Sequence, residues 1–133
     1  MKPLSSATRK IVCQHVWKIF GPNPEKLLNR ISADATRADV LQQTGHVVAV
    51  RDVTFAVQPG KTFVVMGLSG SGKSTLIHLL CRFYDPQSGG VFLDDIDYRE
   101  LRLTDIRSRI ALVNQHTELF NETVAYNIRY GTL

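Results

Sequence analysis

The chain has 133 residues and is 44% hydrophobic, a composition that suits a single domain with an ordinary core. Its net charge of +4 is modest, and no alternation of aromatic and basic residues supports a nucleic-acid partner, so we expect none. The polar N-terminus lacks the apolar segment of a signal peptide, and no stretch approaches the roughly 18 apolar residues of a membrane span. We therefore expect a cytoplasmic protein that reaches a membrane only through a partner.

The N-terminal part of the chain is expected to form a strand followed by a helical insertion. Residues 1–10 are expected to be flexible, and residues 11–20 mix alternating polarity with β-forming residues, which predicts a strand. The insertion spans residues 22–46. Its first short helix is expected to be opened by Pro24 and capped by Asn23.

A second helix of the insertion and two strands are predicted next. Thr36 and Asp39 have the spacing of a capping box, and Gly45 is expected to end the helix that they begin. Strands are then expected near residues 47–57 and 61–66. The second of these is an apolar run rich in β-branched residues, which is typical of a buried strand.

A phosphate-binding motif follows the second strand. The sequence Gly67-Leu-Ser-Gly-Ser-Gly-Lys-Ser74 fits the pattern G-x-x-x-x-G-K-[ST] at every fixed position, and helical apolar spacing follows it. A strand, a glycine-rich loop and a helix that begins near Lys73 are the context that this motif requires. The residues of the motif that we expect to bind ATP are Gly67, Ser69, Gly70, Ser71, Gly72, Lys73, Ser74 and Thr75.

The chemistry of phosphate binding explains these residue types. Glycines allow the crowded backbone conformations in which successive N–H groups turn inward around phosphate oxygens. Lys73 is expected to reach the β- and γ-phosphates, and the Ser74 hydroxyl is expected to bind Mg²⁺. One alternative is a glycine- and serine-rich surface turn with an unrelated lysine. A dinucleotide-binding fingerprint is excluded, because Thr75 stands where its third glycine or alanine belongs.

The remaining elements are short. We expect a strand at 91–93, a brief helix at 104–108 with Thr104 as its cap, a strand at 110–113 and a helix at 123–129. Two further pairs of residues are predicted to be structural. Asp94 and Asp95 are expected to form a hairpin turn, with a catalytic carboxylate as the alternative. Cys13 and Cys81 lack metal-like spacing and are expected to be buried thiols.

Two residues outside the motif are candidates for the same site. Gln115 follows the predicted strand 110–113, where its amide oxygen could bind Mg²⁺ and contact the attacking water, so we predict a catalytic and metal-binding role. Phe20 ends the first strand and is a candidate platform for the adenine ring. The alternatives are a solvated loop glutamine and a core phenylalanine.

Together these features resemble the nucleotide-binding domain of ABC transporters over nearly the whole chain. Residues 11–82 resemble the ATPase subunit of glycine betaine/proline importers, in the segments Val16-Trp-Lys-Ile-Phe-Gly21 and Val64-Val-Met-Gly-Leu-Ser-Gly-Ser-Gly-Lys-Ser-Thr75 and in the helical insertion. Residues 83–131 instead resemble ABC exporters, nearest the lipid-flippase type, in the segments Phe83-Tyr-Asp-Pro86, Ala111-Leu-Val-Asn-Gln115 and Tyr126-Asn-Ile-Arg-Tyr-Gly131.

The resemblance implies an α/β fold of the ABC-type P-loop NTPase class. We expect an N-terminal antiparallel β subdomain and a partial parallel core sheet, so that residues 11–133 form a truncated nucleotide-binding domain. The resemblance places Phe20 at the adenine-stacking position. It implies transmembrane permease subunits and a second ATP-binding domain as partners, at the inner face of the membrane. The family's signature segment, catalytic carboxylates and switch histidine are not found in this sequence, so ATP hydrolysis is expected to need further elements.

Three functions follow from these patterns. The first is the ATP-binding component of an importer related to glycine betaine/proline uptake. The second is a fragment of the ATPase domain of a lipid or multidrug exporter. The third, from another class, is a nucleotide-binding regulatory fragment without a role in transport.

Overall fold

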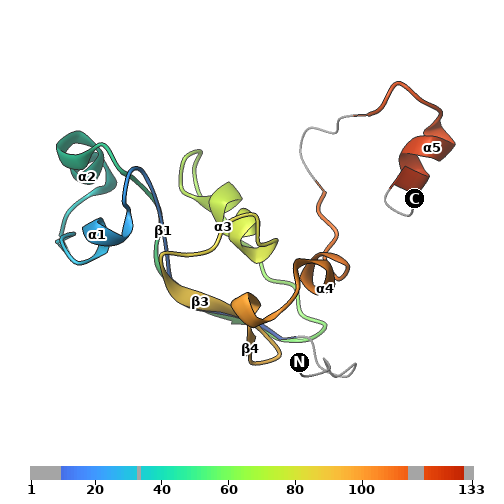
Figure 1. Cartoon of the computed structure of the whole chain (residues 1–133), viewed down its shortest axis with the longest axis horizontal. Helices are drawn as coiled ribbons and strands as arrows, with labels where there is room; N and C mark the ends of the chain where they lie inside the picture. The colour runs from blue at the N-terminus through green and yellow to red at the C-terminus, as the bar shows by residue number, and fades with distance from the viewer. Residues whose placement is uncertain (1–9, 33, 114–118, 131–133) are drawn as a thin grey trace.

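One antiparallel sheet organises the part of the chain that the computed structural model describes, which comprises residues 10–32, 34–113 and 119–130. Its four strands are β1 (Ile11–Phe20), β2 (Val47–Val57), β3 (Ser88–Leu93) and β4 (Ile96–Asp97), in the order β2-β1-β3-β4. Helix α3 (Lys73–Leu80) lies on one face of this sheet (Figure 1). The antiparallel β subdomain predicted from the sequence is therefore confirmed.

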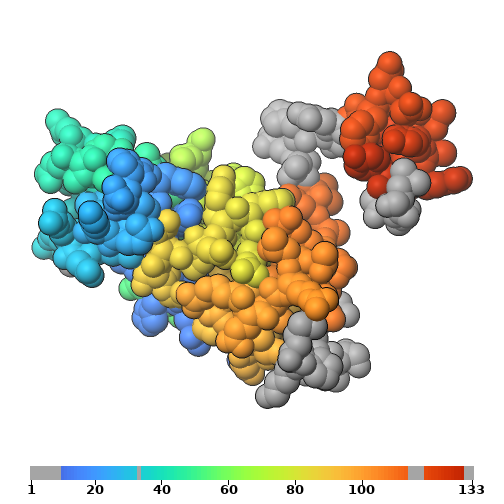
Figure 2. All heavy atoms as spheres, in the orientation of Figure 1, coloured from blue at the N-terminus to red at the C-terminus, as the bar shows by residue number. Residues whose placement is uncertain are grey.

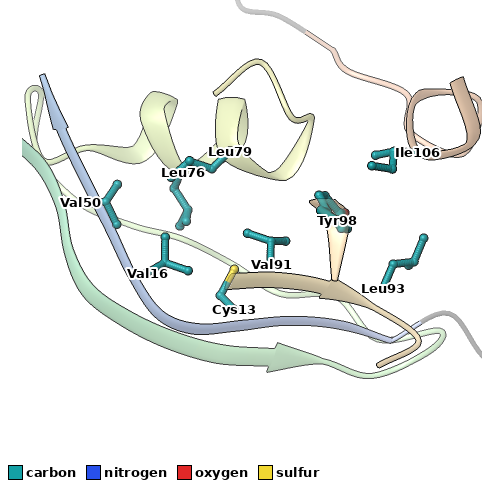
Figure 3. Close-up of a cluster of buried hydrophobic side chains, with 9 residues drawn as sticks. All are labelled: Cys13, Val16, Val50, Leu76, Leu79, Val91, Leu93, Tyr98 and Ile106. Carbon is teal, nitrogen blue, oxygen red and sulfur yellow. The ribbon is translucent and has the colours of Figure 1, made fainter. Parts of the chain in front are cut away.

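The main hydrophobic core lies between the sheet and α3 (Figure 3). Strand side chains such as Val16 and Val91 point toward Leu76 and Leu79 of the helix, and Val16 and Leu79 are almost completely buried. Burial of an aliphatic side chain of this size contributes about 1.5–3 kcal/mol. The helical apolar spacing after the phosphate-binding motif thus serves to attach α3, and with it the motif, to the sheet.

The insertion forms two short helices with a smaller core of their own. These are α1 (Glu25–Leu28) and α2 (Arg37–Thr44), and Leu27 and Val40 pack with Ile19 and Val48 of the strands. The predicted capping box of α2 is confirmed, and the residue that ends α2, Gly45, has the left-handed conformation. The predicted cap of α1 is wrong, because the N-cap position is occupied by Pro24 and no side chain bonds to the free N–H groups of that turn.

The β3–β4 hairpin confirms the structural interpretation of the two acidic residues. Asp94 and Asp95 form its two-residue turn with φ angles of 50° and 63°, a left-handed conformation that aspartate tolerates better than most residues. The backbone N–H of Lys10 donates to Asp94 Oδ1 over 2.8 Å, which fixes the turn against the start of β1. Strand β3 begins at Ser88, three residues earlier than expected.

The helices after the hairpin differ in detail from the expectation. A short 3-10 helix, η1 (Tyr98–Glu100), was not predicted, and α4 (Leu103–Arg107) begins after Arg102, so that Thr104 is not its cap. Helix α5 (Val124–Arg129) is capped by Thr123, whose hydroxyl accepts from the Tyr126 backbone N–H. Residues 119–130 lie apart from the sheet in the space-filling view (Figure 2).

The expected parallel strands do not form in the described part of the chain. Residues 61–66 and 110–113 have no regular secondary structure and no strand pairing, and the partial parallel core sheet is therefore not observed there. Val64, Met66 and Val113 are 69%, 89% and 93% exposed. A strand needs a neighbour to bond its N–H and C=O groups, and β-forming residues alone do not supply one.

None of the helices in the described ranges has the length and apolar character of a membrane-spanning helix.

Candidate functional site

The phosphate-binding motif forms an open loop at the N-terminus of α3. Gly70 and Gly72 have φ angles of 77° and 94°, which side-chain-bearing residues rarely adopt, and Gly72 is the N-cap of the helix. The helix begins at Lys73, as predicted. Residues Ser69 to Thr75 line a cavity of about 480 Å³. Seven of the predicted binding residues are therefore brought together in one hollow.

The electrostatics of this hollow favour an anion. The first turn of α3 contains no acidic residue, so nothing opposes the positive end of the helix dipole there. The ammonium group of Lys73 lies across the loop, where it donates to the carbonyl oxygens of Gly67 and Leu68 (2.7 Å for Leu68) and contacts Ser71 Oγ at 3.3 Å. Gly67, the remaining predicted loop residue, contacts this lysine and is not among the residues that line the hollow.

The loop is attached to the sheet and to the insertion by backbone contacts. A Cβ atom on Gly72 would lie 2.0 Å from the carbonyl oxygen of Ala49 in β2, so only glycine fits at this position. The guanidinium group of Arg37, the first residue of α2, donates to the carbonyl oxygens of Gly70 and Ser71. The Arg37 contacts could not be predicted from local sequence patterns, because more than thirty positions separate the arginine from the loop.

Phe20 lies in a different environment from the loop residues. Its ring contacts Tyr84 edge-on with the ring centroids 5.4 Å apart, and the Lys18 ammonium lies 5.4 Å from its centroid. Lys18 is buried and donates to the backbone oxygen of Asp85 over 3.0 Å, and burial lowers the pKa of its ammonium group. Phe20 is not among the residues that line the loop cavity, so its adenine-stacking role stays a prediction.

The predicted catalytic and metal-binding glutamine, Gln115, lies outside the described residues, and its roles stay predictions. Within the described ranges, no group of three histidine, cysteine, aspartate or glutamate side chains is placed to hold a metal ion. The two cysteines are free, buried thiols, as expected. Burial raises the pKa of Cys13 to about 12, so this thiol is protonated and unreactive at neutral pH.

The chain matches a known family over most of its length. The family model described as ABC transporter matches residues 50–130, which include the loop, α3 and α5. A relative from Pseudoalteromonas atlantica, named ATP-dependent lipid A-core flippase, is 54% identical over 84 residues, which make up 63% of this chain and 14% of the relative. A relative of the same name from Yersinia pestis bv. Antiqua is 36% identical over 98% of this chain and 25% of its own length.

A solved structure shows the same fold. The chain matches a bacterial Atm1-family ABC exporter with ATP bound, with a TM-score of 0.69 and 30% identity over 96% of this chain and 18% of the exporter chain. The curated relatives are likewise much longer, since this chain spans 14% and 25% of the two described above.

The comparisons correct one expectation from the sequence. They do not support the resemblance of residues 11–82 to glycine betaine importers, since the two relatives described above are named as flippases and the structure described above is an exporter. They support the exporter alternative instead. The family match covers more than half of the sequence and contains the phosphate-binding loop. The chain therefore belongs to the ABC transporter family and carries part of its ATP-binding domain.

Proposed function

We propose that the chain is part of the ATP-binding domain of an exporter that moves a lipid, and that it holds ATP and Mg²⁺ at the loop between Gly67 and Thr75. The observation that carries this proposal is the hollow lined by Ser69 to Thr75 at the N-terminus of α3. The names of the relatives, ATP-dependent lipid A-core flippases, support the lipid as cargo.

The loop residues fit a triphosphate and a hard cation. The helix N-terminus and the Lys73 ammonium supply positive charge at the hollow, and backbone N–H groups of the loop other than that of Ser71, which donates to Leu68, can supply donors. Ser74 is exposed at the second position of α3 and offers the kind of hydroxyl oxygen that Mg²⁺ prefers. When bound, Mg²⁺ neutralises part of the negative charge on the phosphates. In this proposal Lys73 binds phosphate oxygens and exchanges its present carbonyl partners for them.

The partners of the site follow from the same proposal. The partners would be transmembrane segments and a second ATP-binding domain, at the inner surface of a membrane, and the second domain would face this loop. Hydrolysis would need residues beyond those of the loop, because the described acids Asp94 and Asp95 are held in a hairpin turn. Gln115 would contribute the side-chain amide that binds Mg²⁺ and orients water. We accordingly expect the chain by itself to bind ATP without turning it over.

Lys73→Ala tests the nucleotide site. Binding of a fluorescent ATP analogue with Mg²⁺ should weaken more than tenfold, because the ammonium is the compact positive charge nearest the phosphates. Lys61→Ala, which removes an equal charge from an exposed position, is the matched control and should bind as the unchanged chain does. Circular dichroism would check that both variants fold. Unchanged affinity in Lys73→Ala would refute the proposed phosphate site.

The exporter assignment needs a separate experiment. Replacing the corresponding quarter of the Yersinia pestis bv. Antiqua relative with this chain should preserve ATP-dependent flippase activity, measured as lipid A-core translocation in vesicles. A hybrid that is assembled and binds ATP but moves no lipid would contradict the lipid cargo while leaving the nucleotide site intact.

A further inference from the structure

Arg37 links the insertion directly to the phosphate-binding loop. From the first position of α2, its Nη1 donates to the Gly70 carbonyl oxygen over 3.1 Å, and its Nη2 donates to the Ser71 carbonyl oxygen over 3.2 Å. The same Nη2 also donates to the Ala49 carbonyl oxygen in β2 over 3.3 Å. One planar guanidinium therefore binds two successive carbonyl groups of the loop and one of the sheet.

The two loop carbonyls belong to the peptide groups whose N–H donors sit at Ser71 and Gly72. In a planar trans peptide the C=O and N–H groups point in opposite directions. Fixing the carbonyls of Gly70 and Ser71 toward Arg37 therefore fixes the N–H groups of Ser71 and Gly72 away from it. The Ser71 N–H donates to the Leu68 carbonyl oxygen over 3.2 Å, which leaves the Gly72 N–H as the donor of this pair for a ligand. A hydrogen bond to a carbonyl also polarises the same peptide and strengthens its N–H as a donor.

Arg37 contacts the loop beside Gly72, a residue restricted by both its backbone conformation and its packing. Gly72 has a φ of 94° and packs against the Ala49 carbonyl oxygen. Arg37 Nη2 lies 3.8 Å from the position that a Cβ of Gly72 would take. The guanidinium, the β2 backbone and the start of α3 therefore meet at one point.

The backbone that carries Arg37 is itself held by hydrogen bonds. Its helix begins with the Thr36–Asp39 capping box, in which the Asp39 carboxylate accepts from both the N–H and the hydroxyl of Thr36. Arg51 of β2 binds the chain just before this cap, donating to the Ala35 carbonyl oxygen over 2.6 Å and to that of Ser32 over 3.0 Å. The start of α2, from which Arg37 extends, is thus held both by its own cap and by strand β2.

We propose that Arg37 is a positioning residue for phosphate binding: by holding the Gly70 and Ser71 carbonyl groups it orients the Ser71–Gly72 peptide so that the Gly72 N–H serves the anion. This inference rests on the proposed nucleotide site and assigns a role to the insertion. Arg37 acts through the loop backbone and does not itself contact the phosphates. Its planar fork matters as well as its charge, because a single ammonium group cannot reproduce two parallel N–H donors in fixed geometry.

Three variants separate orientation from charge. Arg37→Ala removes the fork and the charge, Arg37→Lys keeps only the charge, and Arg30→Ala removes an equal charge from an exposed position in the same insertion. We expect the two Arg37 variants to bind both fluorescent ATP with Mg²⁺ and inorganic triphosphate roughly tenfold more weakly, and Arg30→Ala to bind both normally. Millimolar guanidinium chloride should restore binding to Arg37→Ala.

A second measurement reports on the loop without nucleotide. In the isotope-labelled chain, the amide proton resonances of Ser71 and Gly72 should move upfield in both Arg37 variants, because their peptides lose a polarising bond. Added guanidinium should reverse the shift in Arg37→Ala. Arg37→Lys keeps the test usable if Arg37→Ala does not fold.

The outcomes distinguish this inference from the proposed function. If the unchanged chain binds ATP, Lys73→Ala abolishes binding and Arg37→Lys binds normally, the nucleotide site stands and the positioning role is overturned. Weaker binding in the Arg37 variants without movement of the Ser71 and Gly72 resonances would also overturn it. Failure of the unchanged chain to bind ATP or triphosphate would instead remove the proposed site, while movement of the two resonances would still support the link from Arg37 to the loop.

Discussion

Gly72 packs directly against the Ala49 carbonyl oxygen, so that the third glycine of the phosphate-binding motif is also the contact between the loop and strand β2. A Cβ atom on Gly72 would lie 2.0 Å from that oxygen, a separation that real Cβ atoms do not reach. The residue also has a left-handed φ of 94°. The glycine is therefore required by two independent constraints, its backbone conformation and the space available.

Gly70 provides a control for Gly72. Both have positive φ, but a Cβ on Gly70 would meet no atom within 4 Å. Gly70→Ala should therefore lower the free energy of unfolding by only about 1–2 kcal/mol, the cost of placing alanine in the left-handed conformation. Gly72→Ala should lose clearly more, because the β2 backbone cannot move aside, and its nucleotide affinity should fall as well. Urea unfolding of both variants measures the difference, and equal losses would contradict the packing argument.

Phe20 is expected to contribute to binding of the adenine ring of ATP and not to binding of its phosphates. Phe20→Ala should weaken ATP binding about three- to tenfold, as expected for the loss of one stacking contact. Inorganic triphosphate has no base, and its affinity should not change. Phe20→Tyr keeps the aromatic face and should bind ATP almost normally. Equal losses for ATP and triphosphate in Phe20→Ala would show instead that the ring supports the fold through Tyr84, its edge-on neighbour.

The buried thiol and phenol predict loss of stability at high pH. Burial raises the pKa of Cys13 from 9.0 to about 12 and that of Tyr98 from 10.0 to about 12. At a pH between the unfolded-state and folded-state pKa values, the unfolded chain releases protons that the folded chain retains. The free energy of unfolding should therefore fall as the pH rises from about 9 toward 12. Below pH 9 the contribution is fully present.

Urea unfolding at a series of pH values measures this dependence. Cys13→Ala should reduce the alkaline slope, because the alanine has no proton to lose. At neutral pH a thiol reagent should label the folded chain slowly and the unfolded chain at once. Rapid labelling of the native protein would show that the thiol is accessible.

The exposed apolar segment at 61–66 predicts self-association. Val64 and Met66 are largely exposed, and the backbone around them has no paired strand in the described part of the chain. An unpaired apolar segment of this kind is a template for pairing with another chain. We expect the chain to associate at micromolar concentration and to be only marginally stable as a monomer.

Charged substitutions should reverse the association. Val64→Lys and Met66→Lys should shift the sedimentation profile toward monomer, because lysine opposes both apolar contact and strand pairing. Leu41→Lys, which places the same charge on an exposed leucine of α2, is the matched control and should have no such effect. A chain that sediments as a monomer and unfolds cooperatively at ordinary temperature would contradict this prediction.

Much of the local structure could be predicted because its causes are local. The capping box at Thr36 and Asp39, the glycine that ends α2 and the turn at Asp94 and Asp95 depend on residues a few positions apart, and all three are confirmed. The strand expected at 61–66 failed for the opposite reason. Its residues favour a strand, but pairing needs neighbours that the described chain does not provide.

The candidate site likewise has features with local causes and features with long-range causes. The sequence alone determined the phosphate-binding loop, because the pattern from Gly67 to Ser74 specifies backbone conformation and charge within eight positions. The contacts that hold the loop in place come instead from the tertiary fold. The contacts from Ala49 and Arg37 depend on how a strand and an inserted helix fold back toward the start of α3, and hydrogen bonds between residues so far apart leave no periodic trace in the sequence.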